Sequence, residues 1–155
     1  MSAEATIARL GLVLPASAKP IANYVGAVLM GRTLMISGHI PLGPDGVLMR
    51  SGIVGADVGI AEGQALARQC GINLLGTARS VIGDLDRVAR VVKAVGFIRS
   101  APGFSDQPKV LNGFSDLMVE VFGPDIGAHA RSAVGVSELP LGAPVEVELV
   151  LDIAG

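Results

Sequence analysis

Hydrophobic and polar residues alternate along the last quarter of the chain, on both sides of a loop that contains proline and glycine. Between residues 145 and 153 every second residue is apolar, and most of the residues between them are acidic. Because successive strand residues face opposite sides of a sheet, this alternation predicts a strand with one apolar and one mixed face. Residues 131–136 alternate in a similar way, so we expect the two strands to pair as an antiparallel hairpin.

Such a hairpin would place a cation and two carboxylates together on its mixed face. The residues on that face would be Arg131, Ala133, Gly135, Glu146 and Glu148. Two of these side chains are too small to fill the space beside the guanidinium, and a guanidinium binds carboxylates well. We therefore expect this face to form the floor of a site for a small anionic ligand.

Upstream of this stretch, the apolar pattern predicts a chain that alternates between strands and helices. The expected elements are a helix over 3–10 capped by Ser2, strands over 24–30 and 33–37, a short strand over 47–49, a helix over 58–82, a strand over 88–99 and a helix over 108–122. Two long helices against one mostly antiparallel sheet give an α+β architecture. Gly63, Gly71 and Gly76 each weaken the first long helix by about 1 kcal/mol relative to Ala, which favours a close approach of that helix to the sheet.

Composition narrows the classes of function. The chain has 155 residues, half of them hydrophobic, which suits one domain with a substantial core. A net charge of −2, with one Tyr and no Trp, disfavours a nucleic-acid surface, which needs basic patches and stacking aromatics. No apolar run reaches the ~18 residues of a membrane span, and we do not expect the first residues to act as a signal peptide. The lone Cys70 excludes an internal disulfide and favours a reducing, cytoplasmic compartment.

No metal or cofactor site is expected from the sequence. His39, His129 and Cys70 are the soft ligands of the chain, and they do not lie at a recognised ligand spacing. The glycines do not form a phosphate-binding loop.

Several segments together resemble the RidA/YjgF family of reactive-intermediate deaminases, which is also called L-PSP endoribonuclease. The resemblance is carried by Ala-Arg-Ser at 130–132, Leu-Pro at 139–140, Val-Glu-Val-Glu at 145–148, Tyr24, Ile-Ser-Gly-His-Ile-Pro at 36–41 and Val-Leu-Asn at 110–112. It covers residues 20–153, so residues 1–19 would be a helix and linker added to the core of a single domain over 1–155. The resemblance implies a chorismate-mutase-like fold and a homotrimer with ligand clefts between subunits.

The resemblance also implies an activity. It would be the hydrolysis of 2-aminoacrylate-type enamines and imines to 2-keto acids and ammonia, without a cofactor, on a small 2-imino or 2-keto carboxylic acid. Arg131 would hold the substrate carboxylate and Glu146 would activate water. The further substrate contacts would be Tyr24, Ser37, Gly38, Asn112 and Ala133.

Each role has an alternative. Arg131 could form a cross-strand ion pair with Glu146 or Glu148, and Glu148 could be the base in place of Glu146. His39, Ala133 and Gly135 stand where the family commonly has Gln, Cys and an acidic residue. A binding protein for small carboxylates, without turnover, therefore stays open. An endoribonuclease is disfavoured by the acidic balance of the chain.

Overall fold

The computed structural model describes residues 2–16 and 23–155. The helices and strands are α1 (Ala3–Arg9), β1 (Ala27–Met30), β2 (Thr33–His39), α2 (Ile60–Ile82), β3 (Val88–Arg99), α3 (Gln107–Gly127), β4 (Ala130–Val136) and β5 (Val145–Ile153), with 3-10 turns over Leu85–Arg87 and Pro140–Gly142. The strand over 88–99 has the predicted bounds. Gly123, with φ of 76°, breaks α3 one residue beyond the predicted helix end at 122.

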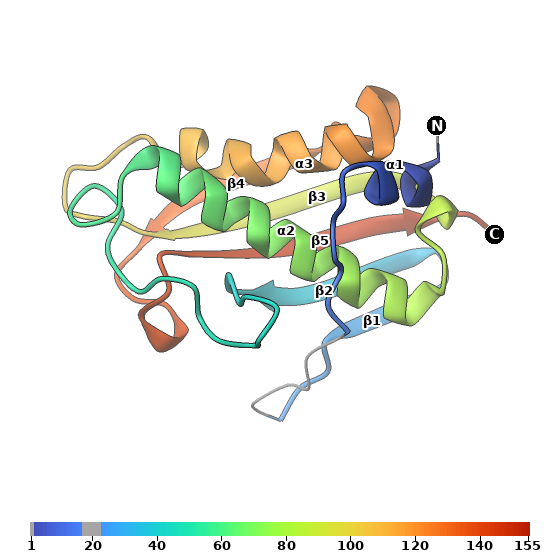
Figure 1. Cartoon of the computed structure of the whole chain (residues 1–155), viewed down its shortest axis with the longest axis horizontal. Coiled ribbons are helices and arrows are strands. Elements are labelled where there is room, and N and C mark those ends of the chain that lie inside the picture. The colour runs from blue at the N-terminus through green and yellow to red at the C-terminus, as the bar shows by residue number, and fades with distance from the viewer. Residues whose placement is uncertain (1, 17–22) are drawn as a thin grey trace.

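One five-stranded sheet forms a layer, and α2 and α3 lie side by side across one of its faces (Figure 1). The strand order is β1-β2-β5-β3-β4, with β3 and β4 parallel and the other neighbours antiparallel. Every second side chain of β5 is buried in the core, at positions 145, 147, 149, 151 and 153. The α+β class and the single mixed sheet are therefore confirmed.

The predicted hairpin between the last two strands is wrong, because β3 lies between β4 and β5. Helix α3 connects β3 to β4, and a helical crossover of this kind returns the chain parallel to its starting strand. Arg131 pairs with Ala94 of β3, which pairs in turn with Leu149 of β5. Glu146 pairs with Phe97, one position out of step with that row.

This pairing also overturns the predicted mixed face. Ala94 and Leu149 are fully or almost fully buried under the helices, so Arg131 starts from the helix-covered face at the sheet edge. Glu146 and Glu148 alternate with buried β5 residues and start from the opposite face. Within one chain, the cation and the two carboxylates do not share a face.

The glycines of α2 serve a different contact from the one predicted. A Cβ at Gly63 would press on Val110 at 3.0 Å, and one at Gly71 would press on Leu117 at 2.8 Å, both of them residues of α3. On α3, a Cβ at Gly113 would overlap the backbone of Gln64. These small residues therefore let the two helices approach each other, rather than letting α2 approach the sheet.

The N-terminal segment is part of the packed structure. Ser2 caps α1 as predicted, with its Oγ accepting a hydrogen bond from the Ala5 amide at 3.2 Å. The side chains of Ala3, Ile7 and Leu14 are buried in the core. The segment that follows α1 then runs across α2 (Figure 1), where a Cβ at Gly76 would overlap the Pro15 carbonyl.

In the N-terminal half of the chain, two predicted strands differ from those observed. Strand β1 is shorter than the predicted 24–30, so Tyr24 lies outside it. Residues 47–49 form no named strand, although Leu48 makes an isolated bridge to Leu42. None of the helices in the described part of the chain is long and apolar enough to cross a membrane.

Candidate functional site

The carboxylate of Glu146 lies against the backbone of Gly38. A Cβ built at Gly38 would overlap Glu146 Oε1, so the absence of a side chain at position 38 creates the room for the carboxylate. Strand β2 is irregular at this point, because its register with β5 shifts between Ile36 and His39. The irregularity brings Gly38 beside Glu146.

Glu146 has an environment that suits a general base. Its carboxyl is partly buried, and burial raises its pKa above the ordinary value; the neighbouring Glu148 raises the pKa further. No ion pair or hydrogen bond to the Glu146 carboxylate is formed by the described residues. A carboxylate with a raised pKa and free lone pairs can accept a proton near neutral pH.

The carboxylate opens onto a cavity of about 560 Å³, which we call the Glu146 cavity. Of the predicted substrate contacts, Tyr24, Ser37 and Gly38 line this cavity together with Glu146. Tyr24 is about half exposed, and the Ser37 hydroxyl donates a hydrogen bond to the Val25 carbonyl at 2.7 Å. The structure thus brings four of the predicted site residues to one place.

His39 fixes the irregular end of β2. Its Nδ1 lies 2.7 Å from the Ser37 carbonyl oxygen, so Nδ1 carries the proton and donates it. Its Nε2 lies 2.7 Å from the Thr77 hydroxyl on α2, which therefore donates to the ring. Burial lowers the pKa of His39, and this keeps the ring neutral in that arrangement.

Arg131 lies on the edge strand β4 and is held by α3. Its guanidinium donates to the Asn112 side-chain oxygen at 2.8 Å, to the Ser115 hydroxyl at 3.0 Å and to the Pro108 carbonyl at 3.2 Å. No described carboxylate lies within ion-pair distance of it, so the cross-strand pair with Glu146 or Glu148 is not formed in this chain. Three contacts leave part of the donor set of the guanidinium available for a ligand.

Ser115 extends this arrangement to a second neutral histidine. His129 Nδ1 lies 2.6 Å from the Gly127 carbonyl oxygen and donates to it, so Nε2, 3.1 Å from Ser115 Oγ, accepts the hydroxyl proton. The ring also packs edge-on against Phe114, with centroids 5.6 Å apart. Burial lowers the pKa of His129, and the charge of Arg131 lowers it further. We call Arg131, Asn112, Ser115 and His129 the Arg131 cluster.

The remaining predicted contact, Ala133, belongs to neither place. Its side chain packs against the hydrophobic core on the helix-covered face. At Gly135, a Cβ would meet Ser100 Oγ at 2.7 Å and Gln107 Nε2 at 3.0 Å, so those side chains occupy the room that an acidic residue would need.

The sequence interpretation missed the part of the cavity that comes from α2. Asn73 and Thr77 are buried and polar, and both line the Glu146 cavity. Asn73 Nδ2 donates to the Ile40 and Leu42 carbonyls, which fixes the segment after β2. Their spacing of four residues in an otherwise apolar stretch was the available signal, because residues four apart share one helix face.

Residues 2–16 and 23–155 offer no group of three or more His, Cys, Asp or Glu side chains that could hold a metal ion. Cys70 is fully buried, and burial raises its pKa well above the ordinary value, so its thiol does not line the site as a nucleophile.

The sequence and the fold match one known family. The sequence model that matches is described as "YjgF/chorismate_mutase-like, putative endoribonuclease" and covers residues 4–153. The chain therefore belongs to the YjgF family, as the resemblance of its motifs indicated.

Three comparisons show how close known relatives are. Protein TCP17 of Trypanosoma cruzi is 46% identical over 149 residues, covering 96% of this chain and 92% of the relative. A protein of Dermatophagoides farinae named 2-iminobutanoate/2-iminopropanoate deaminase is 31% identical over 139 residues, covering 90% and 92%. A solved structure from Shewanella oneidensis, titled as a putative endoribonuclease, superimposes with a TM-score of 0.94 at 30% identity, covering 99% and 100%.

Proposed function

We propose that this protein is an enamine/imine deaminase that hydrolyses 2-imino acids to 2-keto acids and ammonia in clefts between copies of a homotrimer. The observation that carries the proposal is the position of the Glu146 carboxylate, which lies over Gly38 at the wall of a cavity. The pKa of this carboxylate is also raised by burial. Membership of the YjgF family and the name of the Dermatophagoides farinae relative support the same reaction class.

The proposed reaction needs one proton carrier and one anion-binding group. Glu146 takes a proton from water as the water oxygen bonds to C2 of the imine. Glu146 passes this proton to the imine nitrogen, which gives a carbinolamine. As the C2–N bond breaks, the second water proton leaves the new hydroxyl and reaches the departing nitrogen through Glu146, so that imine and water give keto acid and ammonia. Arg131 binds the substrate carboxylate and fixes C2 relative to the water. Oxidation states are unchanged, and no cofactor is needed.

A cleft between copies would unite the two groups. In one chain, Glu146 and Arg131 start from opposite faces, on strands separated by β3. The face of the sheet away from the helices also exposes apolar side chains, among them Val28, Met35 and Val134. A ring of copies would cover this face and bring the Arg131 cluster of one copy to the Glu146 cavity of the next. A cytoplasmic location fits the single, buried Cys70.

Activity is tested with imines generated in place from amino acids by an amino-acid oxidase, with catalase present and semicarbazide as a trap for free imine. We expect the protein to lower the yield of the trapped imine and to speed ammonia release relative to buffer. An unchanged yield over the whole panel, with 2-keto acids still bound, would favour the binding protein instead. Two observations favour a binding protein as the second candidate: both ring nitrogens of His39 are hydrogen-bonded within the chain, and Ser100 and Gln107 occupy the space beside Gly135.

Co-expression of Arg131→Ala and Glu146→Gln chains tests the cleft between copies. Each variant alone should be inactive. In a random mixture about a quarter of the clefts would combine an intact Arg131 with an intact Glu146 from the neighbouring copy. Recovery of activity near that level, with a trimer mass by light scattering, is the expected result. A monomer mass, or no recovery in mixed trimers, would show that the site is not shared between copies.

A further inference from the structure

Helix α2 carries three polar side chains along one side, next to residues of the hydrophobic core. Gln69, Asn73 and Thr77 lie four residues apart, so they follow one another on the same face of the helix. Asn73 and Thr77 are only 6% and 2% exposed, and the nearby Cys70 and Leu74 are fully buried. Buried polar groups cost free energy unless they are hydrogen-bonded, so the partners of these side chains are informative. We call Gln69, Asn73 and Thr77 the α2 row.

Two members of the α2 row hold the backbone that follows β2. Asn73 Nδ2 donates to the Ile40 and Leu42 carbonyls at 3.2 and 3.0 Å. Gln69 Nε2 donates to the same Leu42 carbonyl at 3.1 Å and to Asn73 Oδ1 at 3.0 Å. These contacts fix residues 40–42 to the helix directly after the last residue of β2.

Thr77, the third member, is linked to the Glu146 carboxylate through the backbone of β2. Its hydroxyl donates to the His39 ring, and the ring donates to the Ser37 carbonyl, each over 2.7 Å. Gly38 lies between these two β2 residues and makes the room for Glu146 Oε1. No hydrogen bond joins Thr77 to Glu146 in the described part of the chain, so Thr77 acts on the carboxylate through residues 37–39.

We propose that Thr77 is a positioning residue for the proton transfer by Glu146. Its hydrogen bond to His39 keeps the end of β2 out of regular register with β5, and this irregular backbone places the carboxylate over Gly38. An irregular segment loses partners in the sheet, so its polar groups need others. The α2 row supplies these partners. This inference rests on the proposed function, in which Glu146 carries the proton.

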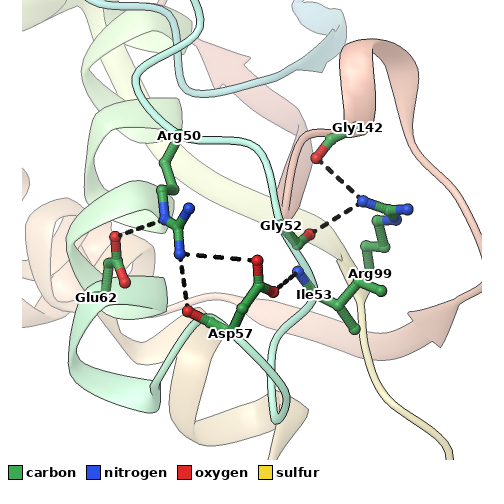
Figure 2. A network of polar contacts seen from close by, with 7 residues as sticks. All are labelled: Arg50, Gly52, Ile53, Asp57, Glu62, Arg99 and Gly142. Carbon is green, nitrogen blue, oxygen red and sulfur yellow. Dashed lines mark hydrogen bonds and ion pairs between the residues drawn. The ribbon is translucent and has the colours of Figure 1, made fainter.

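A separate network fixes another part of the cavity wall. Leu141 lines the cavity with a φ of 58°, a left-handed conformation that is unfavourable for leucine. The carbonyl of the next residue, Gly142, accepts from the Gly52 amide at 3.0 Å and from Arg99 (Figure 2). These contacts hold the turn around Leu141 and do not include residues 37–39, so the two networks can be tested independently.

The test is Thr77→Val, which replaces the hydroxyl by a methyl group and keeps the branched shape. We expect kcat, measured with the imine trap described above, to fall about 10- to 100-fold, because a small misplacement of a catalytic group costs up to that factor. Affinity for 2-oxobutyrate, measured by calorimetry, should stay near the wild-type value, since Arg131 and its contacts are unchanged. Thr77→Ser keeps the hydroxyl and should retain most of kcat.

Arg50→Ala is the matched control for a loss of stability. Arg50 holds the loop before α2 by donating to Glu62 Oε1 at 3.1 Å and to the Asp57 carbonyl at 2.8 Å (Figure 2), and it does not line the cavity. Its removal should lower the melting temperature and leave kcat and affinity unchanged. Equal losses of kcat in Arg50→Ala and Thr77→Val would show that kcat follows stability, which would overturn the positioning role.

The remaining outcomes separate this inference from the proposed function. An unchanged kcat in Thr77→Val, with a large loss in Glu146→Gln, would overturn the positioning role and leave the deaminase in place. A loss of 2-oxobutyrate affinity as large as the loss of kcat would show that Thr77 supports the cavity as a whole, and it would overturn the specific link to Glu146. No turnover of any imine by the wild-type protein would overturn the function, and the positioning role with it.

Discussion

The Glu146 cavity, beside β2 and β5, and the Arg131 cluster, at the β4 edge of the sheet, contain the same histidine arrangement. In each, Nδ1 donates to the carbonyl two residues earlier and Nε2 accepts a hydroxyl from a helix, Thr77 for His39 and Ser115 for His129. Both rings are neutral in these arrangements, and burial lowers the pKa of both. Neither ring is therefore poised to act as an acid; each fixes a strand end.

The two places differ in what the histidine supports. In the Arg131 cluster, Ser115 passes the constraint on to the guanidinium, which α3 also holds through Asn112 and Pro108. In the cavity, His39 holds the Ser37 backbone carbonyl next to Gly38 and does not contact Glu146, so the Glu146 carboxylate stays without a hydrogen-bond partner among the described residues. A braced cation suits binding of a fixed anion, and an unpaired carboxylate suits proton transfer. The two places are thus complementary rather than redundant.

Of the substitutions that test this difference between the two places, Glu146→Gln should have the largest effect, and the effect should be on turnover. The amide keeps the shape but cannot accept a proton, and general-base catalysis contributes about 10²–10⁴-fold. We expect kcat to fall by that factor while 2-oxobutyrate affinity, measured by calorimetry, stays near the wild-type value. Glu148→Gln is the control, since Glu148 acts on Glu146 through its charge. If Glu148→Gln abolishes turnover and Glu146→Gln does not, the base is Glu148.

Arg131→Ala should act on binding first. A hydrogen bond to a charged group contributes about 1.5–3 kcal/mol, so 2-oxobutyrate affinity should fall more than tenfold. The melting temperature should also fall, because three hydrogen bonds to α3 are lost. Arg131→Lys should rescue poorly, since an ammonium lacks the planar fork. A less stable protein with normal affinity would make Arg131 a purely structural residue.

Gly38→Ala tests the contact that places the carboxylate. The new Cβ would overlap Glu146 Oε1, the end of a flexible side chain, so the carboxylate must rotate away, at a cost of about 0.5–1.5 kcal/mol of stability. The same substitution in a Glu146→Ala chain should cost much less, because the overlapping atoms are gone. Denaturant unfolding of the four proteins gives the coupling energy. Additive effects would mean that Gly38 is required for a reason other than Glu146.

Elements governed by local pattern were predictable from sequence. The strand over 88–99 and the alternation of β5 follow from a period of two, and the cap at Ser2 follows from its hydroxyl. Ser37, Gly38 and Glu146 line one cavity because β2 and β5 are neighbours in the sheet, and Tyr24 joins them from the segment before β1.

Contacts between distant segments were not predictable in the same way. Period and turn chemistry give no information on which strand lies beside β5, so β3 was missed as the neighbour and Arg131 was assigned the wrong face. The glycines of α2 were recognised as sites of close approach, but their partner, α3, depends on tertiary packing. Leu141 was invisible as well, since a positive φ at leucine follows from the hydrogen bonds of its turn and not from its residue type.

The smallest expected effect is the loss of stability at acidic pH, and measuring it tests whether His39 and His129 behave alike. With a lowered folded-state pKa, each binds fewer protons in the folded than in the unfolded state just below the ordinary value of 6.5. Acid therefore favours unfolding, and stability is lost as the pH falls from above 6.5 toward the folded-state pKa. Glu146, whose pKa is raised above 4.5, has the opposite sign: stability falls as the pH rises through its folded-state value.

We expect the melting temperature of the wild-type protein to fall between pH 7.5 and pH 5.5, and His39→Gln and His129→Gln each to reduce that fall. Glutamine does not titrate but can still donate and accept one hydrogen bond. In the wild-type protein, protonated His129 can no longer accept the hydrogen bond from Ser115, which in turn holds Arg131, so 2-oxobutyrate affinity should fall in acid. Because glutamine does not titrate, this acid-induced loss of affinity should be smaller in His129→Gln. His39→Gln should leave that pH dependence of affinity in place. If both variants change stability and affinity in the same way, the two histidines serve one common structural role and the proposed division between binding and proton transfer does not extend to them.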